Sequence, residues 1–209
     1  MVLKTAGELR AFCDELAEAT ASPGGGSAAA ASGAIGASLL AMVCGITANS
    51  KKHAHKKPQL DELRDVLLFL QNDLIENARL DAQAYDKVVE AARKRRESPD
   101  ESTDRLFDAA IKHAADVPLR TAELCAKVLG LSVTVSGLGS RSAASDVGTA
   151  VRMAEAGFMG AAMNVYINLS SIKDAGYAKA LSEKVEDLAE SAGKSVSDAM
   201  ASLGLGPRK

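Results

Sequence analysis

Apolar residues recur along this chain at helical spacing, and they divide it into six predicted helices. The clearest stripe falls between about residues 59 and 96, where leucine and alanine return every three or four positions. At 1.5 Å per residue this helix is roughly 55 Å long, more than a compact domain of this size spans, so a partner chain could cover part of it. The other predicted helices span about 6–19, 27–49, 101–129, 145–172 and 177–203.

Two features interrupt the fourth predicted helix. Pro118 falls inside its apolar pattern, and a kink or break is expected there because proline lacks the N–H that a helix needs. The alternation over 131–135 would suit a strand, but one short strand has nothing to pair with, so helix end or loop is expected. With no convincing strand, the chain is predicted to be all-α, a single-domain bundle over residues 1–209 with a long central helix.

A run without any charged residue extends from Ala19 to Ser50. It is long enough to span a bilayer, but it consists mainly of alanine, glycine and serine. Such small side chains let helices approach closely. We therefore expect a central helix surrounded by other helices, and no membrane partner.

Composition narrows the classes of function. The chain has 209 residues, a formal net charge of −2, 3% aromatic residues and no tryptophan. Nucleic acid is an unsuitable partner for such a chain, because its binders present a basic face or stacking aromatics. The three cysteines are widely spaced, so we expect no metal site. Without a signal peptide they indicate reduced thiols and a cytoplasmic location.

The most informative short motif is Gly24-Gly25-Gly26-Ser27, which opens the second predicted helix. Backbone N–H groups at a helix N-terminus that lack neighbouring side chains form a cradle for a polar ligand. A tight turn into a buried helix explains the same residues equally well. The motif alone leaves both interpretations open.

Asp81 lies midway along the long predicted helix, next to its apolar stripe, and Tyr85 follows one turn later on the same face. Burial raises the pKa of a carboxyl group and suits it to general acid–base chemistry. The alternative is a solvated aspartate beside the stripe.

Further polar candidates stand elsewhere in the sequence. Asn164 and Asn168 share one face of an apolar helix, where they either tie helices together or bind a polar ligand. Asp146 stands at a predicted helix start, where capping is its simplest role. Lys51 and Lys52 would either hold an anionic ligand tail or form a solvated turn.

These segments, taken in order, resemble the cyclodeaminase/cyclohydrolase family of folate enzymes over nearly the whole chain. The residues that carry the resemblance are Ser22-Pro23-Gly24-Gly25-Gly26-Ser27-Ala28-Ala29, Met42-Val43-Cys44, Lys51-Lys52, Asp81-x-x-Ala84-Tyr85, Asp116-Val117-Pro118-Leu119, Ser145-Asp146-Val147-Gly148-x-Ala150 and Ala162-Met163-Asn164-Val165-Tyr166-Ile167-Asn168.

The resemblance implies an all-α fold, a homodimer, and a tetrahydrofolate substrate that carries one carbon between N5 and N10. It implies either closure of 5-formimino-tetrahydrofolate with loss of ammonia, or hydrolysis of the methenyl bridge. No cofactor is expected beyond the tetrahydrofolate itself. The family's proposed catalytic acid/base falls on Asp81.

The expected roles of the remaining candidates follow from this chemistry. Asp146, Asn164 and Asn168 would orient the pterin or the leaving group. The Gly24–Gly26 backbone would let the flat ligand approach. Lys51 and Lys52 would bind the glutamate carboxylates of the tetrahydrofolate, whether or not it is polyglutamylated. Two rivals stay open: a non-catalytic helical dimerisation protein, and an unrelated helical lyase acting on another amidine.

Overall fold

Six α-helices and two short 3-10 helices make up residues 6–204, the part of the chain that this computed structural model describes. Those residues contain no strand, so the prediction of an all-α bundle is confirmed. In chain order the elements are α1 (Ala6–Ala17), α2 (Gly25–Ala48), η1 (Lys51–Lys56), α3 (Lys57–Glu97), α4 (Glu101–Leu138), η2 (Arg141–Ala143), α5 (Ala144–Leu169) and α6 (Ala175–Leu203).

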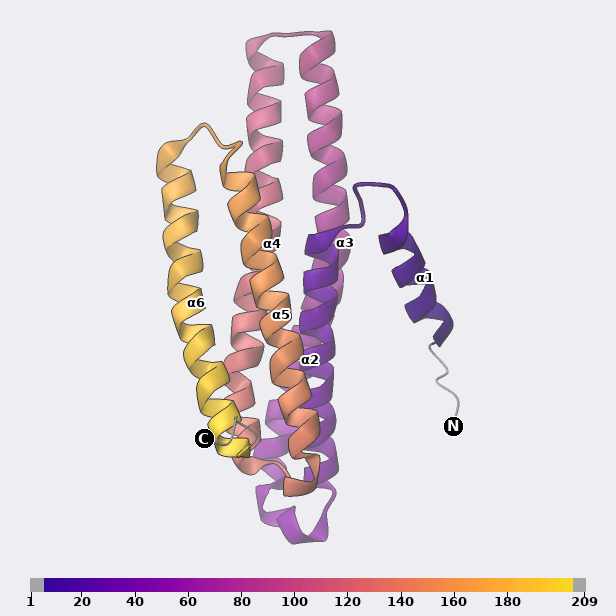
Figure 1. Cartoon of the computed structure of the whole chain (residues 1–209), viewed down its shortest axis with the longest axis vertical. Helices are drawn as coiled ribbons and strands as arrows, with labels where there is room; N and C mark the ends of the chain where they lie inside the picture. Colours follow the sequence, from indigo (N-terminus) through magenta and orange to yellow (C-terminus); the bar gives the residue numbers. More distant parts are fainter. Residues whose placement is uncertain (1–5, 205–209) are drawn as a thin grey trace.

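The bundle is built around α2, which packs against α3 on one side and α5 on the other (Figure 1). The long helices α3 and α4 form a hairpin whose upper end projects beyond the rest of the bundle, and α6 covers α4 and α5. Helix α1 stands away from the bundle on the side of α3. Side chains such as Leu40, Leu74 and Phe158 fill the core.

The apolar composition of α2 follows from its central place. By length and composition alone, α2 and α4 could each cross a membrane, but the core helix of a soluble protein meets the same criteria. In α2, 56% of the 18-residue apolar stretch is buried inside the bundle. Small residues bring its backbone close to that of α5: a side chain at Gly157 would stand 2.7 Å from the Ala29 carbonyl oxygen and 2.8 Å from the Gly33 nitrogen. The two helices are therefore in direct backbone contact.

We expect Gly157→Ala to lower the free energy of unfolding by about 1–3 kcal/mol, because the new methyl group would overlap backbone atoms that cannot yield. Gly193→Ala is the matched control, since Gly193 lies inside α6 with open space around it. There we expect a gain of about 0.5–1 kcal/mol from helix propensity. Urea titration measures both changes, and equal effects of the two substitutions would contradict the close contact.

Of the kink or break predicted at Pro118, the break does not occur. Helix α4 passes through Pro118 and continues to Leu138 through the segment 131–135. Proline at position 118 leaves the carbonyl oxygen of Ala114 without its usual N–H partner. The side-chain amide of Asn168 donates a hydrogen bond to that oxygen at 2.8 Å. An asparagine on α5 thus replaces the missing backbone donor of α4.

We expect Asn168→Ala to lower the free energy of unfolding by about 1–3 kcal/mol, because it leaves the Ala114 carbonyl oxygen unsatisfied. In a Pro118→Ala background the new backbone N–H supplies that hydrogen bond, and the loss should shrink. Denaturation of the wild type, both single variants and the double variant measures the coupling. Additive effects of the two substitutions would show that Asn168 does not compensate for the N–H that Pro118 lacks.

Candidate active site

Asp81 lies in the middle of α3, and its carboxylate rests against the first turn of α2. A Cβ atom at Gly26 would stand 2.6 Å from Asp81 Oδ2, so only glycine leaves room for this approach. The Ser27 hydroxyl donates hydrogen bonds to Asp81 Oδ2 at 3.1 Å and to the carbonyl oxygen of Ala78 at 3.0 Å. The glycine motif therefore makes space for a carboxylate from the same chain, and Ser27 holds that carboxylate.

Burial raises the pKa of Asp81 above the ordinary value of 3.8, while hydrogen bonds from the Ser27 side chain and backbone N–H act in the opposite direction. Burial is the larger of these effects. A partly buried carboxyl group whose pKa lies above the usual range accepts a proton more readily than a solvated aspartate. Such a group is suited to accept and return a proton.

A cavity of about 370 Å³ opens beside Asp81, between α2, α3, α4 and α5. We call it the Asp81 cavity. Within residues 6–204, Asp81 is its only charged lining residue, and no lysine or arginine of this part of the chain lines it. Its lining combines Ala21, Ser22, Gly24, Gly25, Gly26, Asp81, Ala84, Tyr85, Val88, Ile111, Ala114, Asn164, Ile167, Asn168 and Ser171.

Two amides form one side of this cavity. Asn164 donates to the carbonyl oxygen of Gly160 at 2.8 Å, and Asn168 donates to those of Ala114 and Asn164 at 2.8 and 2.9 Å. Within residues 6–204 neither side-chain oxygen accepts a hydrogen bond. Asn168 therefore ties α5 to α4, and the side-chain oxygens of both asparagines remain available to accept a hydrogen bond from a ligand.

The rest of the cavity wall is largely apolar. Tyr85 lies one turn beyond Asp81 on α3 and is 43% exposed, and Val88, Ile111 and Ile167 complete this part of the lining. An aromatic ring and aliphatic side chains offer a flat surface to a planar ligand. The cavity thus combines an apolar wall with a single proton-transfer group and two amide acceptors.

Three predicted site residues lie far from this cavity within one chain. Lys51 and Lys52 belong to η1, beyond the opposite end of α2, which at 24 residues is about 36 Å long. Asp146 stands in the first turn of α5, about 27 Å along the helix from Asn164. A single chain therefore does not bring these three residues together with Asp81, and their role in substrate binding stays a prediction.

The predicted capping role of Asp146 is wrong. Helix α5 begins at Ala144, its N-cap residue is Ala143, and no side chain makes a capping hydrogen bond there. Asp146 thus stands inside the first turn. An acidic side chain at that position is still favourable, since it faces the positive end of the helix dipole.

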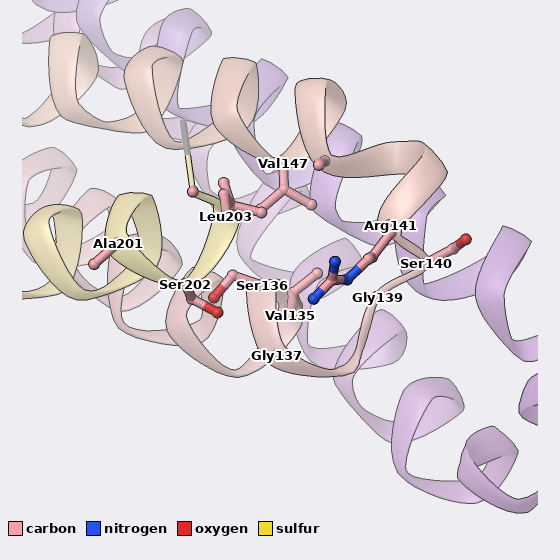
Figure 2. Close-up of a pocket in the computed structure, with 12 residues that line it drawn as sticks. Val135, Ser136, Gly137, Gly139, Ser140, Arg141, Val147, Ala201, Ser202 and Leu203 are labelled. Carbon is pink, nitrogen blue, oxygen red and sulfur yellow. The ribbon is translucent and has the colours of Figure 1, made fainter. Parts of the chain in front are cut away.

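A larger cavity of about 450 Å³ lies near the opposite end of the bundle, among the end of α4, η2 and the end of α6 (Figure 2). Among the residues that the structure describes, Arg141 is the only charged one in its lining, accompanied by serines such as Ser136 and Ser202. An arginine stays protonated and cannot exchange a proton at neutral pH. Despite its larger volume, this cavity has no group for acid–base chemistry among residues 6–204.

Asn77 is a supporting residue that the sequence did not single out. It is only 4% exposed, and its amide donates to the Val117 carbonyl oxygen at 2.8 Å and to Thr121 Oγ1 at 2.6 Å. It therefore fastens α3 to α4 one turn before Asp81. The sequence feature that could have identified Asn77 is its position, four residues before Asp81 and in line with the apolar stripe of α3.

Residues 6–204 contain no cluster of three or more histidine, cysteine, aspartate or glutamate side chains arranged to hold a metal ion. The expectation of a reaction without metal therefore stays a prediction. The Asp81 cavity offers a carboxylate and amides, which suit proton transfer and hydrogen bonding.

Comparison with known proteins connects this geometry to a chemistry. The sequence profile described as formiminotransferase-cyclodeaminase matches residues 8–187. A methenyltetrahydrofolate cyclohydrolase of Methylorubrum extorquens is 35% identical over 187 residues, covering 88% of this chain and 90% of that protein. A formimidoyltransferase-cyclodeaminase of Mus musculus is 29% identical over 186 residues, and the chain spans about a third (34%) of its length.

The fold has a solved counterpart. The crystal structure of formiminotetrahydrofolate cyclodeaminase from Thermotoga maritima superposes with a TM-score of 0.85, at 26% identity, over 94% of this chain and 95% of that one. The similarity therefore extends over the complete bundle that surrounds the Asp81 cavity.

Proposed function

This chain belongs to the formiminotransferase-cyclodeaminase family, and on that premise we propose that it is a folate one-carbon enzyme whose reaction takes place at Asp81. The observation that carries the proposal is the partly buried Asp81 carboxylate, held by Ser27 at the edge of a cavity with an apolar wall. The names of the relatives agree with the expectation of a folate enzyme.

Of the two reactions of such enzymes, we favour hydrolysis of 5,10-methenyl-tetrahydrofolate. The relative with 35% identity carries that name, and the alignment covers 90% of its length, so it is a chain of similar extent. Closure of 5-formimino-tetrahydrofolate is the second candidate. It is supported by the structural similarity to the Thermotoga maritima cyclodeaminase.

In the hydrolysis, water attacks the bridge carbon while the Asp81 carboxylate takes one of the water protons. The resulting tetrahedral carbon carries a hydroxyl group and remains bonded to N5 and N10. The bond to N5 then breaks, its electron pair stays on N5, and Asp81 returns its proton to that nitrogen. The hydroxyl group loses its proton to solvent, and a formyl group remains on N10.

The same carboxylate would serve the alternative reaction. N10 attacks the carbon of the protonated formimino group, whose C=N electron pair moves to the terminal nitrogen and makes it an amine, and Asp81 accepts the proton that N10 loses. Asp81 then gives that proton to the amine as the bond from the carbon to this nitrogen breaks, so that ammonia leaves and the methenyl cation remains. Both reactions thus need one group that accepts and returns a proton at the bridge.

The cavity supports this placement of the substrate. Its apolar wall at Tyr85, Val88 and Ile111 would receive the flat pterin, and Gly24–Gly26 let the ligand approach the α2 backbone. The side-chain oxygens of Asn164 and Asn168 would accept hydrogen bonds from pterin N–H groups. These contacts would hold the bridge carbon beside Asp81.

We expect Asp81→Asn to fold and to lower turnover of methenyl-tetrahydrofolate by about 10²–10⁴-fold, because an amide cannot exchange the proton. In the wild type, kcat/KM should fall toward acidic pH with an apparent pKa above 3.8, since burial raises the pKa of Asp81. Loss of the methenyl chromophore, followed by absorbance, measures both quantities. An Asn variant with wild-type turnover would remove Asp81 from the chemistry.

Stability provides a check on the same pKa. Between 3.8 and the raised pKa, the folded chain binds the Asp81 proton more tightly than the unfolded chain does. The free energy of unfolding contributed by Asp81 therefore falls as pH rises through this window. This pH dependence should be absent from Asp81→Asn.

We further propose that the enzyme is a homodimer that acts in the cytoplasm without a membrane, nucleic acid or additional cofactor. One face of α2 faces away from the bundle and carries no charge; we call it the α2 stripe. Ile35, Met42 and Ile46 on it are 44%, 41% and 54% exposed. The stripe consists of Ala28, Ala31, Ser32, Ile35, Ser38, Leu39, Met42, Gly45, Ile46 and Asn49.

Two further observations support these proposals. Helix α1 stands outside the bundle with Leu9 57% exposed, as expected of an arm that packs on a second chain (Figure 1). The three cysteines are free, and burial raises the pKa of Cys44 to about 11 and that of Cys125 to about 12, so both buried thiols stay protonated. Free thiols are typical of a reducing compartment.

We expect Ile35→Asp to convert the dimer to monomers, because it places a charge in the middle of the α2 stripe. Val66→Asp on α3 is the matched control, since Val66 is 43% exposed but lies outside the stripe. Sedimentation velocity measures the oligomeric state. A wild type that sediments as a monomer, or an Ile35→Asp variant that stays dimeric, would contradict an interface at α2.

A further inference from the structure

The Asp81 cavity lacks a partner for one part of the proposed substrate. A tetrahydrofolate ends in the carboxylates of glutamate. Yet no lysine or arginine of the described part of the chain lines this cavity, and the only charged group there, Asp81, is itself negative. An anionic tail leaving the cavity would find no cation in its lining. If the chain acts on folates, a cation has to come from elsewhere.

The two cations of the cavity next to the Asp81 cavity are already paired. A neighbouring cavity shares Ile111 and Ser171 with the Asp81 cavity and contains Lys112 and Lys173. Lys112 bonds to Asp174 at 2.8 Å, and Lys173 lies 3.5 Å from Asp108. Each lysine is thus balanced by an aspartate and offers little net attraction to another carboxylate.

Lys51 and Lys52 differ from those lysines. Both are exposed on η1, and within residues 6–204 neither forms an ion pair or a side-chain hydrogen bond. Their neighbours Lys56 and Lys57 do have partners, the carbonyl oxygen of Leu138 and the carboxylate of Asp61. A pair of free cations therefore stands at the end of α2 that is remote from Asp81.

The α2 stripe supplies a geometric link between the two ends. It extends from Ala28 to Asn49, and Gly25, which stands one turn before it, lines the Asp81 cavity. Two copies of a helix that pair antiparallel about a two-fold axis bring opposite ends together. Because small residues such as Ala28, Ala31 and Ser38 are spread along the stripe, the two copies of α2 can approach closely.

The register follows from the limits of the stripe. Pairing that buries its full length is centred between Ser38 and Leu39, so Ala28 of one copy faces Asn49 of the other. Each further residue faces the residue that lies equally far from this centre on the other side. Gly26 then faces position 51, and Gly25 faces position 52. In this arrangement η1 of each copy lies against the glycine motif of the other.

We propose that Lys51 and Lys52 of the partner subunit complete the Asp81 cavity and bind the glutamate carboxylates of the folate. This inference rests on the proposed function and on its dimer. It makes each site composite: Asp81 and the amides come from one subunit, and the cations come from the other. It also reconciles the predicted role of these lysines with their position in the single chain.

A heterodimer test separates binding in trans from binding in cis. Lys51→Ala/Lys52→Ala homodimers should show a KM for methenyl-tetrahydrofolate raised about ten-fold, from the loss of both cations. Methenyl-tetrahydropteroate, which lacks glutamate, should show no such change. The two-lysine variant and Asp81→Asn are then co-expressed with different affinity tags, and the mixed dimer is purified.

Only binding in trans leaves one intact site in that mixed dimer: Asp81 from the lysine variant, with Lys51 and Lys52 from the Asp81→Asn subunit. The mixed dimer should therefore recover about half of the wild-type kcat/KM. In a cis arrangement neither site is intact, and the mixed dimer should have no more than half of the low kcat/KM of the lysine variant. In the control, Lys194→Ala, on the exposed surface of α6, takes the place of the two-lysine variant. This mixed dimer should have half of the wild-type kcat/KM whether the lysines bind in trans or in cis.

Three results would overturn the proposal: no recovery in the mixed dimer, an unchanged KM in the two-lysine variant, or no dimer at all. A raised KM in Lys112→Ala/Lys173→Ala, with the two-lysine variant unaffected, would assign the tail to the neighbouring cavity of the same chain. Each of these results leaves the proposed function intact if the wild type turns over methenyl-tetrahydrofolate. An inactive wild type would instead reject that function itself.

Discussion

The candidate site depends on one contact, in which the Asp81 carboxylate occupies the space where a side chain at Gly26 would stand. This contact takes the carboxyl group partly out of water, which raises its pKa, and brings it within reach of the Ser27 hydroxyl and backbone N–H. A side chain at position 26 would displace the Asp81 carboxylate from this place. The glycine motif and the aspartate thus form a single unit, although they are far apart in sequence.

The scaffold around this unit is held by small residues and by asparagines. Backbone contact between α2 and α5 at Gly157 sets the separation of the two helices, and with it the position of Asn164 next to Gly25. Asn168 and Asn77 fasten α5 and α3 to α4 on either side of Pro118. The polar groups of the cavity wall are therefore also bonds of the fold, so the cavity has little freedom to collapse.

Much of this could be predicted from the sequence, because it is encoded locally. Helical periodicity gave the six helices to within a few residues, apart from the end of α4, and the neighbourhood of Asp81 and Tyr85 follows from spacing on one helix. The unbroken helix at Pro118 could not be foreseen, because the compensating donor, Asn168, comes from another helix. The sequence leaves the last turns of α4 open between helix end and loop, because β-branched residues in 131–135 suit strand and helix alike, and the structure shows helix to Leu138.

The position of Lys51, Lys52 and Asp146 was beyond sequence reasoning for a different physical reason. The order of motifs along a chain does not say at which end of a helix bundle each one lies, and these three residues fall at the end opposite to Asp81. Only the three-dimensional path of α2 shows the separation. Pairing of two chains along α2 would bring Lys51 and Lys52 of one chain close to the Asp81 cavity of the other.

The central claim, that the folate bridge reacts at Asp81, is tested most directly by a crystal structure of the protein with bound methenyl-tetrahydrofolate or a stable analogue. The account predicts that the bridge carbon lies beside the Asp81 carboxylate, with the pterin between Tyr85 and Asn164. A ligand bound instead in the larger cavity near Arg141, with the Asp81 cavity empty, would contradict it.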